Sequence, residues 1–199
     1  MDASTLPFPE ESAPEPNLPS PVTLNTELLD GRRRRLRAQI WIPAGADRVW
    51  AVLTDYKRLA DFIPNLTQSR VIEQEGDRVR LEQVGKEKLW KVNFAAKVVL
   101  DMVLEAPRAI RFSQFQGDFN EFSGAWLLEP QIRSDAQQGD TAGTQLTYEL
   151  LVHPKRTMPL KLVECNLNVG LPRNLTAIYQ ETLRRLHETA SPQTEQDKL

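Results

Sequence analysis

The chain has 199 residues, of which 40% are hydrophobic and 26% charged, and its formal net charge is −2. This length and composition are typical of one soluble globular domain with short tails. The apolar runs fall far short of the roughly 18–20 residues that a bilayer-spanning helix needs, so we expect no transmembrane segment. Cys165 is the only cysteine; it cannot form a disulfide framework and fits a reducing compartment, so we expect a cytoplasmic protein.

The first thirty residues differ in composition from the rest. Residues 1–31 contain six acidic residues and no Lys or Arg, and six prolines interrupt residues 7–21. Such a segment has no apolar period with which to offset its ordering entropy. We therefore expect a disordered acidic, Pro-rich leader over 1–30, a folded domain over 31–190 and a disordered tail over 191–199. The leader also lacks the marks of a signal or transit peptide.

The folded part begins with a predicted strand and two short helices. Apolar residues alternate with polar or aromatic ones over 33–42, which predicts the first strand. Pro43 ends it. A short helix is expected from Asp47, and a second helical turn over 57–62 stops at Pro64.

A series of strands follows, expected at 78–84, 90–104, 108–116, 121–129 and 144–152. In 90–104 every even position is apolar, which predicts a half-buried antiparallel strand. At about 3.4 Å per residue this strand would span roughly 50 Å, so we expect the sheet to curve. The hydrophilic stretch 131–143 is expected to lengthen a hairpin loop.

From Met158 the apolar period becomes helical, and one stripe runs from Leu160 to Leu186. Pro172 should kink or break this helix. Together the elements predict an α+β fold in which a curved antiparallel sheet of about six or seven strands wraps around a long C-terminal helix.

Four segments carry a family resemblance: 43–56 (PAGADRVWAVLTDY), 62–65 (FIPN), 124–130 (GAWLLEP) and 158–178 (MPLKLVECNLNVGLPRNLTAI). In this order and spacing the chain resembles the polyketide cyclase/dehydrase and coenzyme-Q-binding START-like family, within the SRPBCC, or helix-grip, superfamily. The resemblance implies a cavity for a hydrophobic small molecule between the sheet and the last helix. It is specific for the fold more than for the function, because this superfamily contains carriers, cyclases and ligand sensors.

We expect apolar and aromatic side chains of the strands and the last helix to line this cavity. The candidates are Val79, Leu81, Val92, Phe94, Ala96, Val98, Phe112, Trp126, Leu146, Tyr148, Val163, Leu167, Leu171 and Leu175. Gln83, Gln114 and Tyr148 are candidate polar anchors for the ligand, with a solvent-facing orientation as the alternative. Solid packing of the helix on the sheet is the alternative to a cavity.

Asp55 and Tyr56 lie where the first short helix ends, and either acid–base chemistry or capping and packing would explain them. His153 and His187 are isolated in the sequence, and no nucleophile motif or phosphate-binding loop is present. We therefore expect no metal, no cofactor and no catalytic residue.

A basic cluster precedes and enters the first strand: Arg32, Arg33, Arg34, Arg35 and Arg37. It is a candidate contact with an anionic membrane surface, which would make the protein peripheral to a membrane. The alternative is a solvated face that the acidic leader partly neutralises. No nucleic-acid partner is expected, because interleaved aromatic residues are missing.

The leading hypothesis is a non-enzymatic protein that binds or carries a hydrophobic molecule, a polyprenyl quinone or a lipid as the resemblance implies. A cyclase or dehydratase acting on a polyketide-like substrate would instead place a convergent set of His, Asp or Arg side chains inside the cavity. A partner-binding adaptor would have a filled cavity and an exposed apolar patch.

Overall fold

The computed structural model describes residues 21–89, 92–135 and 139–190, and these form one antiparallel sheet and three helices. The elements in chain order are β1 (Thr23–Leu28), β2 (Arg34–Ile42), α1 (Ala46–Leu53), α2 (Leu59–Phe62), β3 (Leu66–Glu75), β4 (Arg78–Leu89), β5 (Val92–Glu105), β6 (Ala109–Gly117), β7 (Phe119–Asp135), β8 (Gly139–Pro154) and α3 (Leu160–Ala190). None of the helices in the described part of the chain is both long and apolar enough to cross a membrane.

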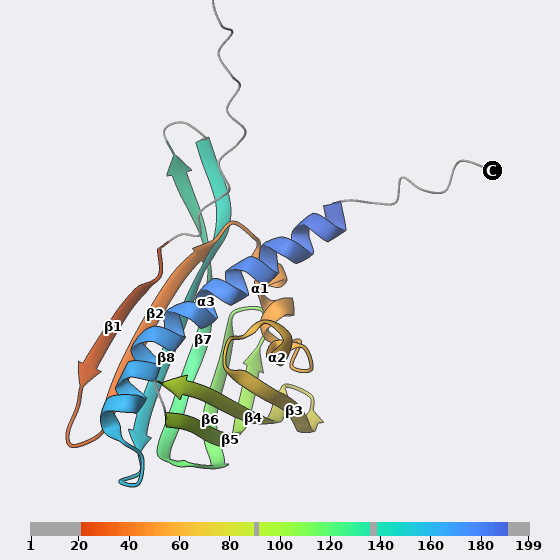
Figure 1. Ribbon diagram of the computed structural model, residues 1–199. Helices are drawn as coiled ribbons and strands as arrows, with labels where there is room; N and C mark the ends of the chain where they lie inside the picture. Colours follow the sequence, from red (N-terminus) through yellow and green to blue (C-terminus); the bar gives the residue numbers. More distant parts are fainter. Residues whose placement is uncertain (1–20, 90–91, 136–138, 191–199) are drawn as a thin grey trace, which may run out of the picture.

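The sheet is curved and eight-stranded, with the order β1-β2-β8-β7-β6-β5-β4-β3. Figure 1 shows α3 lying diagonally across one face of this sheet, with α1 and α2 beside its C-terminal half. The arrangement confirms the predicted curved sheet and long terminal helix, although the sheet has eight strands where six or seven were expected.

The sequence did not predict the two edge strands, β1 and β3. β1 falls within the expected disordered leader, yet it pairs with β2 along its whole length, with Leu24 opposite Ala38. Most side chains of both edge strands are exposed, so backbone pairing holds these strands and no apolar alternation marks them. The leader prediction was therefore wrong for residues 23–28. Its residues 1–20, and the expected tail 191–199, lie outside the described residues.

The stretch 131–143 also differs from the expectation of a longer loop. β7 and β8 continue through it as paired strands as far as Asp135 opposite Gly139, and Figure 1 shows this hairpin projecting beyond the rest of the sheet. The Ser134 hydroxyl and the Asp140 carboxylate lie 2.6 Å apart across the hairpin. Polar side chains suit such a projection, because both of its faces meet water.

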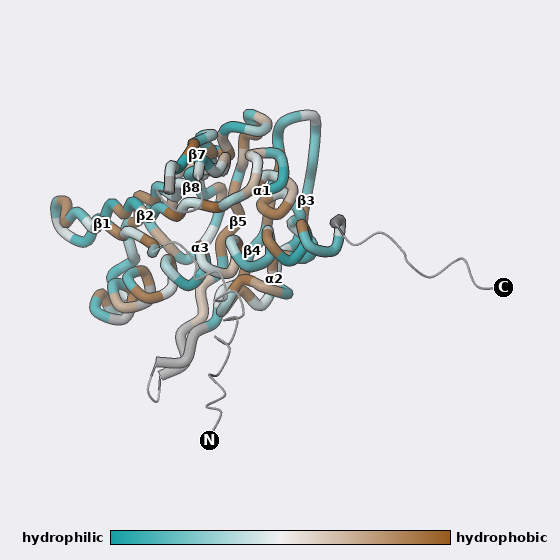
Figure 2. Tube along the Cα trace, turned by 90° about the horizontal axis from the view of Figure 1, so that it is seen from above, coloured by the Kyte–Doolittle hydropathy of each residue, from teal (hydrophilic) through white to brown (hydrophobic). Residues whose placement is uncertain are grey.

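The predicted alternation holds in the central strands. The even positions of β2 (Leu36, Ala38, Ile40 and Ile42) are all buried, and so are Val98, Leu100 and Met102 of β5. Figure 2 shows hydrophobic stretches of α1, α2 and β5 towards the middle of the molecule and a hydrophilic β3 at its rim. The apolar face of the sheet thus forms the core against the helices.

Polar contacts attach α3 near both of its ends. Near the N-terminus, Arg34 Nη2 lies 2.7 Å from Glu164 Oε1, and Arg34 is only 7% exposed. Arg32 donates to the carbonyl oxygens of Lys155 and Met158, in the turn that leads into α3. Near the C-terminus, Arg185 Nη2 lies 2.9 Å from Asp55 Oδ2. Between these points α3 continues through Pro172 as one helix, so the expected break is absent.

Replacing Arg34 tests this attachment. Arg34→Ala would leave Glu164 without its partner and would remove the hydrogen bonds to the Gly31 and Arg33 carbonyls. We expect the free energy of unfolding to fall by about 2–3 kcal/mol, because a largely desolvated pair is broken. Urea denaturation measures the change.

The matched control is Arg37→Ala on the same strand. Arg37 is exposed and lies 3.6 Å from Glu149, so its loss should cost at most about 0.5 kcal/mol. Equal losses from the two variants would contradict an anchoring role for Arg34.

Candidate ligand-binding site

A cavity of about 290 Å³ lies between the sheet and the helices. Its walls come from α1 and α2, the loop after α2, the inner face of the sheet from β3 to β8, and one face of α3. The lining residues are Leu53, Tyr56, Leu59, Ile63, Pro64, Asn65, Leu66, Leu81, Gln83, Gly85, Leu100, Met102, Ile110, Phe112, Phe122, Trp126, Tyr148, Leu150, Leu167, Gly170, Leu171, Asn174 and Ile178.

Aromatic rings from three neighbouring strands form the sheet side of the cavity. The Tyr148 ring centroid lies 4.0 Å from that of Trp126 and 5.9 Å from that of Phe112. Gly124 makes room for this cluster: a Cβ there would come within 1.9 Å of the Glu149 carbonyl oxygen and 2.8 Å of the Phe112 ring. The cluster therefore presents a broad apolar surface to an occupant.

The exposure of the lining residues indicates that the cavity opens at the α2–β3 loop. Pro64 and Asn65 are the exposed lining residues of that loop. Asn65 has a φ of 66°, which an asparagine tolerates, and its carbonyl accepts a hydrogen bond from the Lys86 amide at 2.8 Å. Gly170 of α3 also lines the cavity, and an added Cβ there would meet no atom of the described residues within 4 Å. The absence of a side chain at Gly170 leaves space at this part of the cavity wall.

Among the described residues, the polar side chains that line the cavity are uncharged. They are the phenols of Tyr56 and Tyr148 and the amides of Asn65, Gln83 and Asn174. Burial raises the pKa of Tyr56 to about 12 and also raises the pKa of Tyr148. Both phenols therefore keep their protons at neutral pH and can donate hydrogen bonds.

An ion-pair network fixes the turn that carries Tyr56. Asp55 binds Arg185, whose Nε lies 2.7 Å from Glu181 Oε1. Glu181 also accepts from Arg184 Nε at 2.7 Å. The hydrogen bond from Arg184, followed by that from Arg185, lowers the pKa of Glu181 to about 2 against the opposing effect of burial. Asp55 thus points to α3, while the adjacent Tyr56 lines the cavity.

The structure places seven of the predicted site residues in the cavity lining: Leu81, Gln83, Phe112, Trp126, Tyr148, Leu167 and Leu171. Six others lie outside it, namely Val79, Ala96, Val98, Leu146, Val163 and Leu175. All of these except the half-buried Ala96 are buried; Leu146 and Leu175, for example, are 0% exposed in the packed core. The side chains of Val92 and Phe94 lie outside the described residues.

Gln114, predicted as a polar anchor, also lies outside the lining. Its Nε2 donates to the Phe119 carbonyl at 3.0 Å, and its Oε1 is buried without a hydrogen-bond partner among the described residues. Gln114 therefore connects β6 to the start of β7.

Sequence reasoning missed the contribution of α1, α2 and the loop after them. Leu53, Leu59 and Ile63 line the cavity, whereas the sequence had predicted only a short helix and a helical turn in this region. The available signal was the motif at 62–65, which the resemblance includes and which forms one side of the opening.

The arginine cluster makes contacts within the fold. Arg33 binds Glu121 at 2.8 Å, Arg35 binds Glu27 at 2.8 Å and Arg37 lies 3.6 Å from Glu149. Arg32 and Arg34 hold α3, as described above. Each member of the cluster thus has an acidic or carbonyl partner within the fold. Glu27 and Asp30, which pair with Arg35 and Arg33, belong to the acidic segment 1–30, so these contacts agree with the alternative of a face partly neutralised by that segment.

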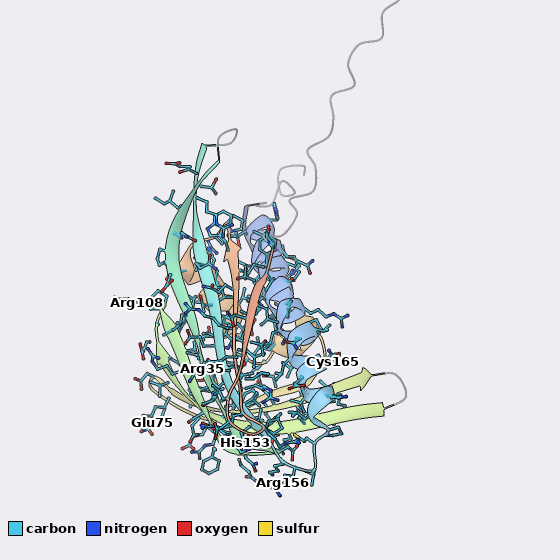
Figure 3. The ribbon with its side chains drawn as sticks, turned by 90° about the vertical axis from the view of Figure 1, so that its left-hand side faces the viewer. Arg35, Glu75, Arg108, His153, Arg156 and Cys165 are labelled. Carbon is cyan, nitrogen blue, oxygen red and sulfur yellow. The ribbon has the colours of Figure 1, made fainter. Side chains whose placement is uncertain are left out.

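The histidines and the cysteine lie apart from the cavity lining. Figure 3 shows His153 at the end of the sheet and Cys165 on α3, well separated from each other. Within residues 21–89, 92–135 and 139–190, no three His, Cys, Asp or Glu side chains are grouped so as to hold a metal ion.

A curved antiparallel sheet around a long C-terminal helix, with an apolar cavity between them, defines a START-like, helix-grip domain. The family model described as polyketide cyclase / dehydrase and lipid transport matches residues 42–178. The chain belongs to this family. A comparison with curated protein sequences gave no significant match.

Solved structures show the same fold at low sequence identity. A STAR-related lipid transfer protein from Xanthomonas axonopodis is 18% identical, with a TM-score of 0.65 over 85% of this chain and 96% of that one. The Zhui aromatase/cyclase from a Streptomyces species is also 18% identical, with a TM-score of 0.57 over 80% and 97%. A START superfamily protein from Mycobacterium smegmatis is 15% identical, with a TM-score of 0.59 over 76% and 98%.

The Glu181 network predicts a pH dependence of stability. Because the pKa of Glu181 falls from its ordinary 4.5 to about 2 on folding, its stabilisation is fully present above pH 4.5 and is lost as the pH falls towards 2. We expect Glu181→Gln to lower the free energy of unfolding at pH 7 by about 1–2 kcal/mol, a value reduced by the partial exposure of both arginines. Thermal or urea unfolding between pH 2 and pH 7 should show this difference shrinking with acid.

Glu149→Gln is the control, because Glu149 is 43% exposed and its partner Arg37 lies 3.6 Å away. That variant should follow the wild type within about 0.5 kcal/mol at every pH. A Glu181→Gln deficit that stayed constant down to pH 2 would show that the loss is not electrostatic.

Proposed function

We propose that this protein binds and carries a hydrophobic small molecule in the cavity between the sheet and α3. The observation that carries the proposal is the cavity itself: about 290 Å³, apolar over most of its lining, with a few uncharged hydrogen-bonding groups. This volume is at the lower end of the range of small-molecule sites, about 300–1,000 Å³. A polyprenyl quinone or a lipid chain is the ligand class that we favour.

The energetics of an unfilled apolar space support an occupant. Because the cavity opens to solvent, its apolar walls are in contact with water when no ligand is bound. Removing such apolar surface from water is favourable. A fitting apolar ligand would restore the missing contacts and stabilise the folded state.

The chemistry of the lining supports carriage over cyclisation or dehydration, the activity that the family description also includes. Moving a proton at neutral pH calls for a group whose pKa lies near 7. Among the described residues, the ionisable side chains that line the cavity are Tyr56 and Tyr148, and burial raises the pKa of both further above 7. They are suited to orienting a ligand by hydrogen bonding.

Filling the cavity from α3 tests the proposal. In Gly170→Phe the new ring would enter open space at the cavity wall, and replacing a mid-helix glycine relieves its entropic cost. We therefore expect loss of binding of the apolar fluorophore N-phenyl-naphthylamine, by tenfold or more, with an unfolding midpoint equal to or above that of the wild type. Fluorescence titration and thermal unfolding measure the two effects.

Val169→Phe is the control on the neighbouring, outward-facing position, because Val169 is 40% exposed and outside the lining. It should bind the fluorophore as the wild type does. If Gly170→Phe still bound the fluorophore stoichiometrically and with unchanged affinity, the cavity would not be the binding site.

A further inference from the structure

The hydroxyl of Tyr56, a residue of the cavity wall, lacks a hydrogen-bond partner among the described residues. Tyr56 is 6% exposed and lines the cavity, yet its buried hydroxyl makes no hydrogen bond within the described structure. Buried hydroxyls are nearly always paired, so a solitary one beside a cavity indicates that the acceptor comes from the occupant.

The position of this hydroxyl is fixed by the surroundings of the residue. Tyr56 belongs to the packed core and lies in the turn between α1 and α2. The preceding residue, Asp55, holds that turn to α3 through Arg185, and its carbonyl also accepts from the Arg58 amide at 2.9 Å. A phenol held in this way keeps a fixed position in the cavity wall.

The charge of the lining restricts the ligand further. Because the pKa of Tyr56 is about 12, the phenol stays protonated and donates at neutral pH. The other polar side chains of the lining that the structure describes are also uncharged. A charged ligand group would therefore be desolvated without an opposite charge to compensate it, which is strongly unfavourable.

The shape of the sheet side favours a planar ligand. Phe112, Trp126 and Tyr148 come from adjacent strands and present ring surfaces to the cavity. Aromatic faces of this kind stack on flat ring systems. A volume of about 290 Å³ suits a single ring system of modest size.

We propose that the cavity selects a neutral, planar ligand bearing a carbonyl oxygen, and that Tyr56 determines this selectivity by donating a hydrogen bond to that oxygen. This inference rests on the proposed function, since it describes the ligand of the same cavity. Tyr56 acts in it as a binding residue and takes part in no covalent step.

Three naphthalene derivatives of similar size separate the relevant properties. Methylnaphthalene has no acceptor, acetonaphthone has a neutral carbonyl, and naphthoate has a carboxylate. For the wild type, isothermal titration calorimetry should show the tightest binding for acetonaphthone. Its affinity should exceed that of methylnaphthalene by roughly 3–10-fold, because one hydrogen bond adds to the binding. Naphthoate should bind weakest.

Tyr56→Phe should reduce the affinity for acetonaphthone to that for methylnaphthalene and leave the affinity for methylnaphthalene unchanged. Its unfolding midpoint without ligand should equal or exceed that of the wild type, because no protein hydrogen bond is lost. The matched control is Tyr179→Phe: Tyr179 is 4% exposed but does not line the cavity, so all three affinities should be retained.

The inference is overturned if acetonaphthone binds no tighter than methylnaphthalene, if naphthoate binds tightest, or if Tyr56→Phe weakens all three probes equally. In each of these cases the wild type still binds an apolar probe, so the proposed function stands. If the wild type binds none of the three probes and not the fluorophore either, both the inference and the proposed function are overturned.

Discussion

The attachment of α3 at both ends is the constraint on which the cavity depends. Arg34 and Arg32 hold the N-terminal part against β2 and the preceding turn, and Arg185 holds the C-terminal part against the α1–α2 turn. A helix is stiff over this length, so its middle cannot drop onto the sheet while both ends stay in place. An apolar space that would otherwise collapse therefore remains open beneath it.

The side chains along α3 follow from this arrangement. Leu175 is completely buried and lies outside the cavity lining, so α3 packs into the core at this position. Around Gly170 the helix instead faces the aromatic cluster across the cavity. The change from cavity wall to solid core thus occurs between neighbouring positions of one helix: Asn174 and Ile178 line the cavity, whereas Leu175 between them does not.

That change explains which parts of the site the sequence could predict. A period of two identifies the inner face of a strand, so Leu81, Phe112 and Trp126 were found, but it cannot tell where along that face the packing ends. Val98 and Leu175 share the pattern and lie in solid core. The pattern of charges in the sequence likewise does not show which residues form ion pairs, since Arg34 binds Glu164, 130 positions away in the chain. β1 carried no apolar signal because an exposed edge strand needs none.

Asp55 and Tyr56 are adjacent in the chain but lie in different surroundings: Asp55 forms an ion pair with α3, and Tyr56 lines the cavity. Asp55 belongs to an ionic network whose arginines are partly exposed, where water moderates the cost of charge. Tyr56 faces the interior, where a charged group would be costly and a neutral donor is tolerated only if a ligand or water completes its hydrogen bond. The turn between α1 and α2 carries both residues, so the ionic network that helps to hold α3 over the cavity also fixes the position of Tyr56 in the cavity wall. In the role that we propose for Tyr56, a substitution there changes the ligand preference without disturbing the ion pairs that attach α3.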